Sequence, residues 1–297
     1  MVVREKTARE KLAVELCGIA LETPLFPASG TMAKEALGEV AGVYGAILPK
    51  TTTPKKRAGN PPPRIAETPA GMVNSIGLQN PGVEKFLEGL DDFDLGLPVF
   101  VSVAGDTVDE FVALCERLSV DSRISAVELN LSCPNVEHGG LTFCAGPASV
   151  EEAIHASRAA FPDKPLFAKL TNEGVVANAV AAERAGADAL TVINTIPALT
   201  IDPERQSVLV RGGLSGPAIK PVALRAVYDV SRAVSIPVIA SGGVATGTDA
   251  AEFMLAGATA VQVGTASFVR EPMDILREFS DYLERMDTTA SGLIGAL

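Results

Sequence analysis

The chain has 297 residues, of which 47% are hydrophobic and 21% charged, a composition typical of a globular protein with a large core. Its 36 acidic residues outnumber its 25 lysines and arginines, and the formal net charge of −11 disfavours binding to nucleic acid or to an anionic membrane surface. The sequence has no apolar run long enough to span a bilayer, no amino-terminal signal-peptide pattern and no CxxC pair among its four cysteines. These features predict a cytoplasmic protein without a metal site.

Short apolar runs, rich in β-branched residues and bounded by glycine or proline, recur along the chain and are typical of buried strands. Between most of them lies an amphipathic helical pattern, which predicts parallel strands joined by crossover helices. Eight such strands close a barrel, so we expect an α/β fold, a (β/α)8 TIM barrel, formed by residues 1–297 as a single domain. An open doubly wound sheet is the alternative, but it usually has fewer strands and one dominant glycine fingerprint. The expected strands are Leu25–Ala28, Ala46–Leu48, Val99–Val103, Ala126–Leu129, Leu166–Lys169, Ala189–Ile193, Val238–Ser241 and Ala260–Gly264.

Capping patterns predict where several helices begin. Thr107 with Glu110, and Ser149 with Glu152, each have the spacing of a capping box ahead of an amphipathic segment. Pro221 stands where the first turn of a later helix is expected, a position that proline favours.

Two segments fall outside the strand–helix alternation. Leu12–Leu21, with Gly18 in its middle, is expected to form a short hairpin that plugs the barrel floor. Thr51–Asn80, between the second and third expected strands, is too long and proline-rich for an ordinary connection. Because long loops in compact domains are usually functional, we expect this loop on the substrate side of the barrel.

Glycines follow the last two expected strands, at Gly242, Gly243 and Gly264. In barrels of this type the corresponding loops commonly bind a phosphate, because backbone N–H groups approach a ligand closely at glycine. Ser215 and Gly216, just before a helix, supply a third such segment. For each segment alone, a tight turn is the alternative interpretation. Since the three converge on one corner of the expected barrel, they predict a phosphorylated cofactor or substrate.

Cys133 is the candidate catalytic base or nucleophile. It follows the fourth expected strand, within a loop that holds asparagine on both sides, and it precedes a proline that would fix the turn. A thiol in such a polar, partly exposed place can titrate and accept a proton. The other cysteines, Cys17, Cys115 and Cys144, are expected to be small buried residues of the core.

Two lysines at strand ends need an anionic partner. Lys50 and Lys169 would be costly positive charges in a barrel mouth unless they face a carboxylate, a phosphate or a reduced flavin. Lysines that extend to solvent are the alternative for either one alone. Neutral amides supply paired donors and acceptors that suit a flat heterocycle with imide and carbonyl edges. The candidates are Asn74, Asn130, Asn135 and Asn194.

Several motifs in this order along the chain resemble one known family. NLSCPN at 130–135 and GGLSGPAIKP at 212–221 are the most specific. With PASGT at 27–31, GNPPPR at 59–64, NSIGLQNPG at 74–82, INT at 193–195 and SGGV at 241–244, they resemble the class 1 dihydroorotate dehydrogenases. The resemblance implies an FMN-containing (β/α)8 barrel that oxidises (S)-dihydroorotate to orotate in de novo pyrimidine biosynthesis.

Carried over by position, the resemblance makes Cys133 the base that removes a proton from carbon five of dihydroorotate, while a hydride passes from carbon six to FMN. Lys169 is implied to lie near the flavin edge where negative charge accumulates on reduction. The residues implied to contact the substrate are Lys50, Asn74, Gly77, Leu78, Asn130, Asn135, Asn194 and Thr195. The residues implied to hold FMN are Ser29, Gly30, Lys50, Thr51, Asn130, Lys169, Ile193, Ser215, Gly216, Gly242, Gly243, Gly264 and Thr265.

The segment KTTTPKKRAGNPPPR at 50–64 and Thr195 resemble class 1B, the NAD-linked catalytic subunit. Class 1B implies a homodimer, and a heterotetramer with an iron–sulfur, FAD-containing subunit that passes electrons to NAD. Membrane-linked class 2 enzymes are different, since they use serine as the base. The sequence departs from the family pattern at Met32, at TNEG (171–174) and at Cys144.

Three other interpretations remain open from the sequence. A class 1 enzyme could use another acceptor such as fumarate. A dihydropyrimidine dehydrogenase-like flavin barrel is similar around NLSCP, but that family normally has histidine where Asn135 stands. A non-catalytic flavin- or phosphate-binding barrel is disfavoured, because Cys133, both lysines and all four asparagines are present.

Overall fold

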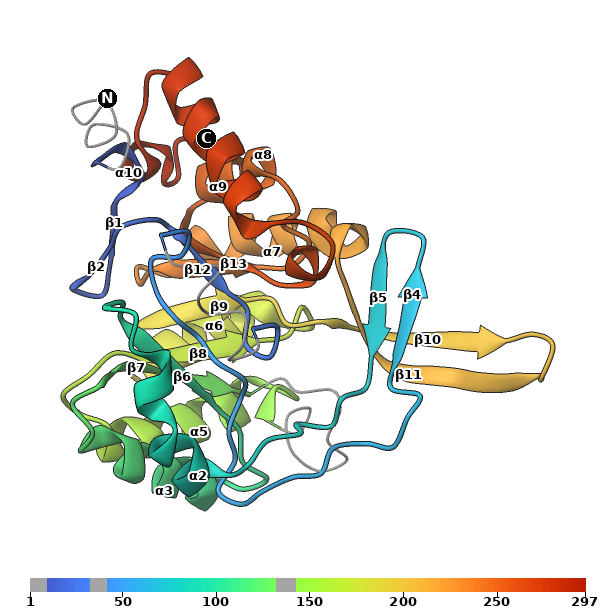
Figure 1. Ribbon diagram of the computed structural model, residues 1–297. Helices are drawn as coiled ribbons and strands as arrows, with labels where there is room; N and C mark the ends of the chain where they lie inside the picture. Colours follow the sequence, from blue (N-terminus) through green and yellow to red (C-terminus); the bar gives the residue numbers. More distant parts are fainter. Residues whose placement is uncertain (1–9, 33–41, 132–142) are drawn as a thin grey trace.

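A computed structural model describes residues 10–32, 42–131 and 143–297 of the chain. Its centre is a parallel sheet curved into a barrel, with helices outside and an antiparallel sheet projecting from one end (Figure 1). In spatial order the parallel strands are β3 (Leu25–Pro27), β13 (Ala258–Val263), β12 (Val238–Ser241), β9 (Ala189–Val192), β8 (Leu166–Leu170), β7 (Ile124–Asn130) and β6 (Val99–Val103).

The eighth barrel position is filled by the segment predicted as strand two, although it forms isolated bridges rather than a regular strand. The Gly45 N–H donates to Leu25 O of β3 at 2.8 Å, while Ile47 N–H donates to Pro98 O at 2.9 Å beside β6. The segment therefore closes the barrel between β3 and β6, and the expected (β/α)8 fold is confirmed. Pro49 has no N–H to donate, which accounts for the broken ladder.

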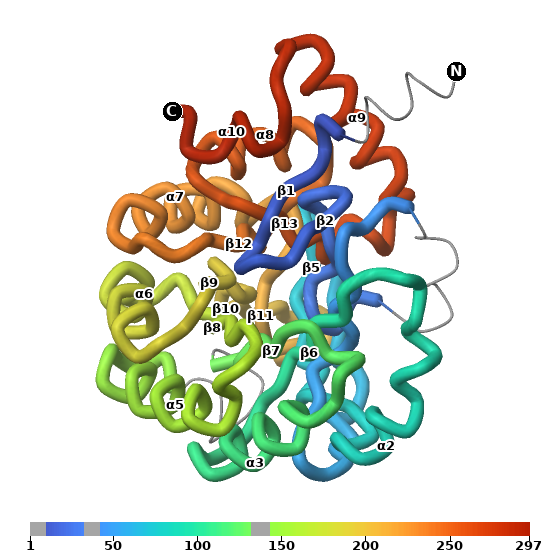
Figure 2. The backbone as a smooth tube through the Cα atoms, turned by 90° about the vertical axis from the view of Figure 1, so that its left-hand side faces the viewer, coloured from blue at the N-terminus to red at the C-terminus, as the bar shows by residue number. Residues whose placement is uncertain are grey.

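Helices surround the barrel and cover the outer face of its strands (Figure 2). The longer ones are α3 (Val108–Ser119), α5 (Pro147–Ala160), α6 (Val175–Arg184), α7 (Lys220–Ser231), α8 (Gly247–Leu255) and α9 (Pro272–Arg285). Shorter helical segments are α2 (Val83–Glu88), η2 (Leu90–Phe93), η3 (Pro217–Ile219), η4 (Thr265–Phe268) and α10 (Ala290–Leu293). Within the described residues, no helix has the length and apolar character needed to cross a membrane.

The predicted helix starts are only partly confirmed. The Thr107 side chain caps α3 by accepting from the Glu110 N–H at 3.2 Å, as expected, and Pro221 lies in the first turn of α7. The prediction of a cap at Ser149 is wrong, because α5 begins two residues earlier, at Pro147. The fixed φ of proline pre-organises a first helical turn, so Pro147 sets the start.

The predicted hairpin is present as β1 (Val14–Leu16) and β2 (Ile19–Leu21). The Cys17 thiol in its turn donates to Asp188 O at 3.3 Å, and Asp188 directly precedes β9. The hairpin therefore lies at the amino ends of the strands, and Figure 2 shows β1 and β2 across that end of the barrel. The expected plug at the barrel floor is confirmed.

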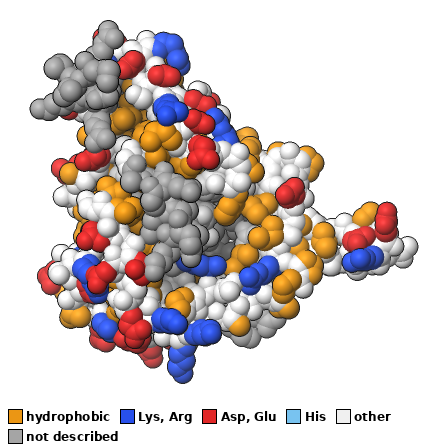
Figure 3. All heavy atoms as spheres, viewed as in Figure 1, with side chains coloured by type: hydrophobic (Ala, Val, Ile, Leu, Met, Phe, Trp, Pro, Cys, Tyr) orange, Lys and Arg blue, Asp and Glu red, His pale blue; other side chains and the backbone are white. Residues whose placement is uncertain are grey.

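A four-stranded antiparallel sheet lies at the opposite end, in the order β10-β11-β5-β4. The long loop expected at 51–80 contributes β4 (Ile65–Thr68) and β5 (Gly71–Asn74), and the segment after β9 contributes β10 (Ile196–Asp202) and β11 (Ser207–Ser215). The β10–β11 hairpin was not predicted, because β10 alternates half-buried and exposed side chains and β11 is mostly exposed or half-buried, so neither forms a buried apolar run. Figure 3 shows hydrophobic side chains gathered over the region of β4 and β5, beside this projecting hairpin.

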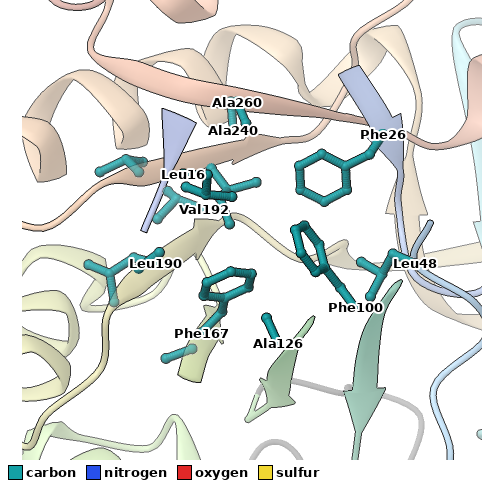
Figure 4. Packing of buried hydrophobic residues seen from close by; sticks show 14 of the residues in the cluster. Leu16, Phe26, Leu48, Phe100, Ala126, Phe167, Leu190, Val192, Ala240 and Ala260 are labelled. Carbon is teal, nitrogen blue, oxygen red and sulfur yellow. The ribbon is translucent and has the colours of Figure 1, made fainter. Parts of the chain in front are cut away.

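Aromatic rings and small side chains fill the barrel interior together (Figure 4). Phe100 packs edge-on against Phe26 and Phe167, with ring centroids 5.6 and 5.3 Å apart. Ala240 and Ala260 on β12 and β13 are fully buried and leave room for these rings. The interior is thus a packed core, and a ligand site has to lie at one end of it.

Candidate active site

A cavity of about 300 Å³ opens at the carboxyl ends of the barrel strands, a volume typical of small-molecule sites. Its wall comes from the strand ends and from the antiparallel sheet. All but one of the predicted site residues that the structure describes line this cavity. They are Ser29, Gly30, Lys50, Thr51, Asn74, Leu78, Asn130, Lys169, Ile193, Asn194, Thr195, Ser215, Gly216, Gly242, Gly243, Gly264 and Thr265.

The exception is Gly77, which lies behind the lining. A side chain there would meet the Asn60 amide, with an added Cβ only 2.6 Å from Asn60 Oδ1. Cys133 and Asn135 lie outside the described residues, so their places in the site stay predictions.

The glycines of the three predicted segments, Gly216, Gly242 with Gly243, and Gly264, all line the cavity. Gly216, Gly242 and Gly243 all have positive φ angles, a conformation that favours glycine. A Cβ at Gly243 would lie 2.7 Å from the Lys220 backbone nitrogen, and one at Gly216 would lie 2.7 Å from the Gly71 Cα. Because these obstacles are backbone atoms, no repacking could admit a side chain. This part of the lining is therefore bare backbone, which suits a phosphate group.

Lys169 rises from β8 into the floor of the cavity, and its side chain is 5% exposed. Its ammonium donates to Gln262 Oε1 at 3.0 Å and to Ser29 Oγ at 3.5 Å, and it lies 4.0 Å from Glu128 Oε1. Glu128 Oε2 accepts from Thr191 Oγ1 at 2.7 Å and from Gln262 Nε2 at 2.8 Å. A buried polar network of Glu128, Thr191 and Gln262 thus lies beneath Lys169.

Sequence reasoning missed the three residues beneath Lys169. Glu128, Thr191 and Gln262 are fully buried, on β7, β9 and β13. The signal was present, because each is a polar residue inside a run otherwise typical of a buried strand. Buried polar groups require partners, so such positions indicate a shared network inside the barrel.

Lys50 supplies a second positive charge and is half-buried beside Arg64. Burial lowers the pKa of Lys50 below its ordinary value, and the Arg64 charge lowers it further. Two cations in a partly desolvated place disfavour one another, and an anionic ligand beside them would relieve that cost. The arrangement fits the predicted carboxylate or phosphate partner.

Amide side chains connect neighbouring parts of the wall. The Asn194 amide donates to Asn130 Oδ1 at 3.3 Å, which joins the ends of β9 and β7. Asn74 Nδ2 lies 3.4 Å from Gly213 O on the neighbouring strand β11. Three of the four predicted asparagines are therefore brought together around one space, and the fourth, Asn135, is outside the described residues.

An apolar wall faces these polar groups and was not predicted. Ile65, Met72 and Ile76 line the cavity from the β4–β5 hairpin and the chain that follows it, next to Leu78. These residues were not predicted as part of the site because the antiparallel sheet that carries them was not predicted. Together the two walls offer an apolar surface and paired amide groups, as a flat heterocyclic ring requires.

The described cysteines are free thiols unsuited to proton abstraction. Burial raises the pKa of Cys17 and of Cys115 to about 12 and the pKa of Cys144 to about 11. They stay protonated at neutral pH. Cys115 and Cys144 are buried in the core as expected, whereas the expectation is wrong for Cys17, which is only half-buried because it stands in the turn of the β1–β2 hairpin. Within the described residues, no group of three or more His, Cys, Asp or Glu side chains could hold a metal ion.

Fold and cavity together define a (β/α)8-barrel protein with a small-molecule-sized cavity at the carboxyl ends of its strands, lined by two lysines and by glycine backbone. The sequence model of the dihydroorotate dehydrogenase family matches residues 11–286. The chain therefore belongs to the dihydroorotate dehydrogenase family, whose members are oxidoreductases.

Curated relatives identify the branch of the family that the chain resembles. The catalytic subunit of dihydroorotate dehydrogenase B (NAD(+)) from Geobacter sulfurreducens is 48% identical over 271 residues, 87% of this chain and 88% of the relative. The corresponding subunit from Geobacter metallireducens is 46% identical and is covered to 99%, against 97% of this chain. A crystal structure of DHODH from Eimeria tenella in complex with ferulenol has a TM-score of 0.83 at 25% identity, over 96% of this chain and 88% of that one. The resemblance to class 1B is confirmed.

Proposed function

We propose that the chain oxidises (S)-dihydroorotate to orotate with FMN bound in the cavity, and that the electrons pass on to NAD through a partner subunit. Family membership establishes the class of reaction. The observation that carries the assignment to this site is the convergence of Lys50, Lys169 and the backbone of Gly216, Gly242 and Gly243 on one cavity. That set has charges for a carboxylate and a reduced flavin, and bare backbone for a phosphate.

The described residues of the cavity have the groups needed to hold FMN. At Gly216 and Gly243 an added Cβ would meet backbone atoms, so both positions require glycine. Ser215 and Thr265, whose hydroxyls are 2.8 Å apart, lie beside Gly216. These groups would hold the phosphate, while Lys169 would lie against the flavin ring system. FMN, when bound, supplies a two-electron acceptor inside the barrel mouth.

The substrate is held by groups at the opposite side of the same cavity. The Lys50 ammonium binds the carboxylate of dihydroorotate, and the Asn74, Asn130 and Asn194 amides pair with the donors and acceptors of its ring. Met72 and Leu78 exclude water from that side. Water exclusion strengthens every charge interaction within the site.

Cys133 is the base in this proposal, and it removes the proton from carbon five. It follows Asn130, which lines the cavity at the end of β7, by three residues. Asn135, two residues further on, completes the amide groups around the substrate. Because the other cysteines are held protonated by burial, the thiol chemistry falls to Cys133.

Anaerobic addition of dihydroorotate to the FMN-loaded chain tests the proposal. We expect the oxidised flavin absorbance to disappear as orotate forms. A chain that binds no FMN after reconstitution would contradict the cofactor assignment, and a flavin that stays oxidised would contradict the substrate. Dihydrouracil is the matched control, because it lacks the carboxylate that Lys50 binds; faster reduction by dihydrouracil would favour the dihydropyrimidine dehydrogenase alternative.

The partner assignment rests on the names of the relatives, which are catalytic subunits of NAD(+)-linked enzymes. We propose a homodimer that assembles with an iron–sulfur, FAD-containing subunit. Trials of NAD, fumarate and quinone as acceptors, with and without co-purifying subunits, test it: NAD reduction that requires the partner is the expected result. A cytoplasmic location and a single domain over residues 1–297 stay predictions from the sequence.

A further inference from the structure

Beneath the cavity floor lies a buried carboxylate that the reaction itself does not use. Glu128, on β7, is 1% exposed and points into the barrel below Lys169. A carboxylate in such a place is expensive unless it is paired and hydrogen-bonded. The groups around Glu128 therefore show how its buried carboxylate is stabilised.

The two oxygens of Glu128 have different surroundings. Oε2 accepts hydrogen bonds from Thr191 on β9 and Gln262 on β13, which fix the carboxylate from two strands. Oε1 has no hydrogen-bond partner among the described residues, and it lies 4.0 Å from the Lys169 ammonium. The carboxylate is thus clamped on one side and turned toward a cation on the other.

Gln262 orients the same pair. Its amide nitrogen donates to Glu128, and its amide oxygen accepts from Lys169 at 3.0 Å. The reverse amide orientation would place a donor against the ammonium and an acceptor against the carboxylate, so the charges fix it. Lys169 lines the cavity, whereas Glu128 and Gln262 do not. The lysine therefore faces the ligand site with a negative charge directly behind it.

We propose that Glu128 is a positioning residue that holds Lys169 at the cavity floor and offsets part of its charge, so that the site favours reduced FMN less strongly than an uncompensated lysine would. The inference rests on the proposed binding of FMN. A fixed cation stabilises the negative charge that accumulates on the reduced flavin, and a carboxylate behind that cation weakens its field. A moderated preference leaves the reduced cofactor able to pass its electrons on.

Glu128→Gln tests this with the potential of the bound flavin. Gln keeps an oxygen for Thr191 and Gln262 but removes the charge facing Lys169. We expect the ratio of the affinities for reduced and oxidised FMN to rise about tenfold, which corresponds to about 30 mV in a two-electron midpoint potential. Thr191→Val is the matched control, because it removes a hydrogen bond from the same carboxylate while both charges stay; its ratio should remain that of the wild type.

The inference is overturned by an unchanged or lower ratio in Glu128→Gln, or by an equal rise in Thr191→Val. If the Glu128→Gln chain does not fold, the Lys169→Met variant is compared with the double variant Lys169→Met/Glu128→Gln. In the Lys169→Met background Glu128 has lost its cation, so the second substitution removes an unpaired charge instead of creating one. There too the added substitution should raise the ratio, and no rise overturns the inference. A wild-type chain that fails to bind FMN defeats the proposed function as well, whereas normal FMN binding with an unmoved ratio defeats this inference alone.

Discussion

The two ends of the barrel use charged side chains for opposite purposes. At the floor, Arg158 donates to Gly186 O at 3.0 Å, to Phe161 O at 2.7 Å and to Lys164 O at 3.0 Å, and it pairs with Asp188. Every one of these partners belongs to the framework of the fold. At the mouth, the Lys50 and Lys169 ammonium groups line a cavity. The Arg158 guanidinium thus ties segments of the fold together, whereas Lys50 and Lys169 lie at a cavity, although Lys169 is itself held by Gln262 and Ser29. Changes at the two ends of the barrel should therefore be separable by experiment.

Cys133→Ser is expected to have the largest effect of the predicted changes, and the effect should be on the rate of flavin reduction alone. A serine hydroxyl ionises far less readily than a cysteine thiol and supplies much less anionic base at neutral pH, so flavin reduction by dihydroorotate should slow by about 10²- to 10⁴-fold. Rapid-mixing absorbance under anaerobic conditions measures it. Cys144→Ser is the matched control, because Cys144 is buried away from the cavity lining, and its rate should stay within a few-fold of wild type. A near wild-type rate in Cys133→Ser would remove Cys133 from its proposed role.

Arg158→Met tests the structural role of Arg158 at the amino-terminal end of the barrel. It removes the Arg158 donor from three backbone carbonyls and from Asp188, which keeps the Leu166 N–H, so the free energy of unfolding should fall by about 2–3 kcal/mol. Urea denaturation measures the loss, and the KM for dihydroorotate should not change. Normal stability of the Arg158→Met variant, or a raised KM for dihydroorotate, would contradict the distinction between the two ends of the barrel.

Lys50→Met is the corresponding change at the mouth. Loss of a charge-assisted contact should weaken orotate binding by about 10- to 150-fold, because such hydrogen bonds contribute roughly 1.5–3 kcal/mol. Titration of the flavin absorbance with orotate measures the affinity. Stability should be unchanged or slightly higher, since the substitution removes a desolvated cation beside Arg64. Unaltered affinity for orotate would show that the carboxylate is held elsewhere.

The smallest expected effect is a shift in a pH profile. The pKa of Lys50 is lowered, so its cationic form is lost at a lower pH than for an ordinary lysine, and orotate affinity should fall as pH rises through that value. Arg64→Gln removes one cause of the lowering and should move the fall to higher pH. Orotate affinity measured from neutral to alkaline pH checks the direction; a shift to lower pH would contradict the electrostatic argument.

The sequence was a good guide to the barrel because buried parallel strands are continuous apolar runs, and those runs are visible without a structure. The convergence of Gly216, Gly242 and Gly243 was predictable for a related reason: glycine at strand ends marks bare backbone, and the barrel geometry places all strand ends together. The motifs then supplied what physical patterns could not, namely the identity of the ligand.

Other parts of the site could not be predicted from these patterns. Strand β10 alternates half-buried and exposed side chains, and the pairing of β11 with β5 joins segments far apart in the chain. Met72 and Ile76 became site residues only through that pairing. Glu128 and Gln262 stand out in the sequence as polar residues within apolar runs, but which side chain each one bonds depends on the register between strands, which the sequence does not show.

The contact between β5 and β11 also limits how this protein could evolve. A Cβ at Gly212 would lie 1.9 Å from Asn74 O, and one at Gly71 would lie 2.0 Å from Ser215 O. Because each obstacle is main chain, neither strand could accept a larger residue at these points unless the other moved away. The β4–β5 loop and the segment leading to Gly216 are thus locked together at these two glycines, so a substitution at either one would have to move both strands.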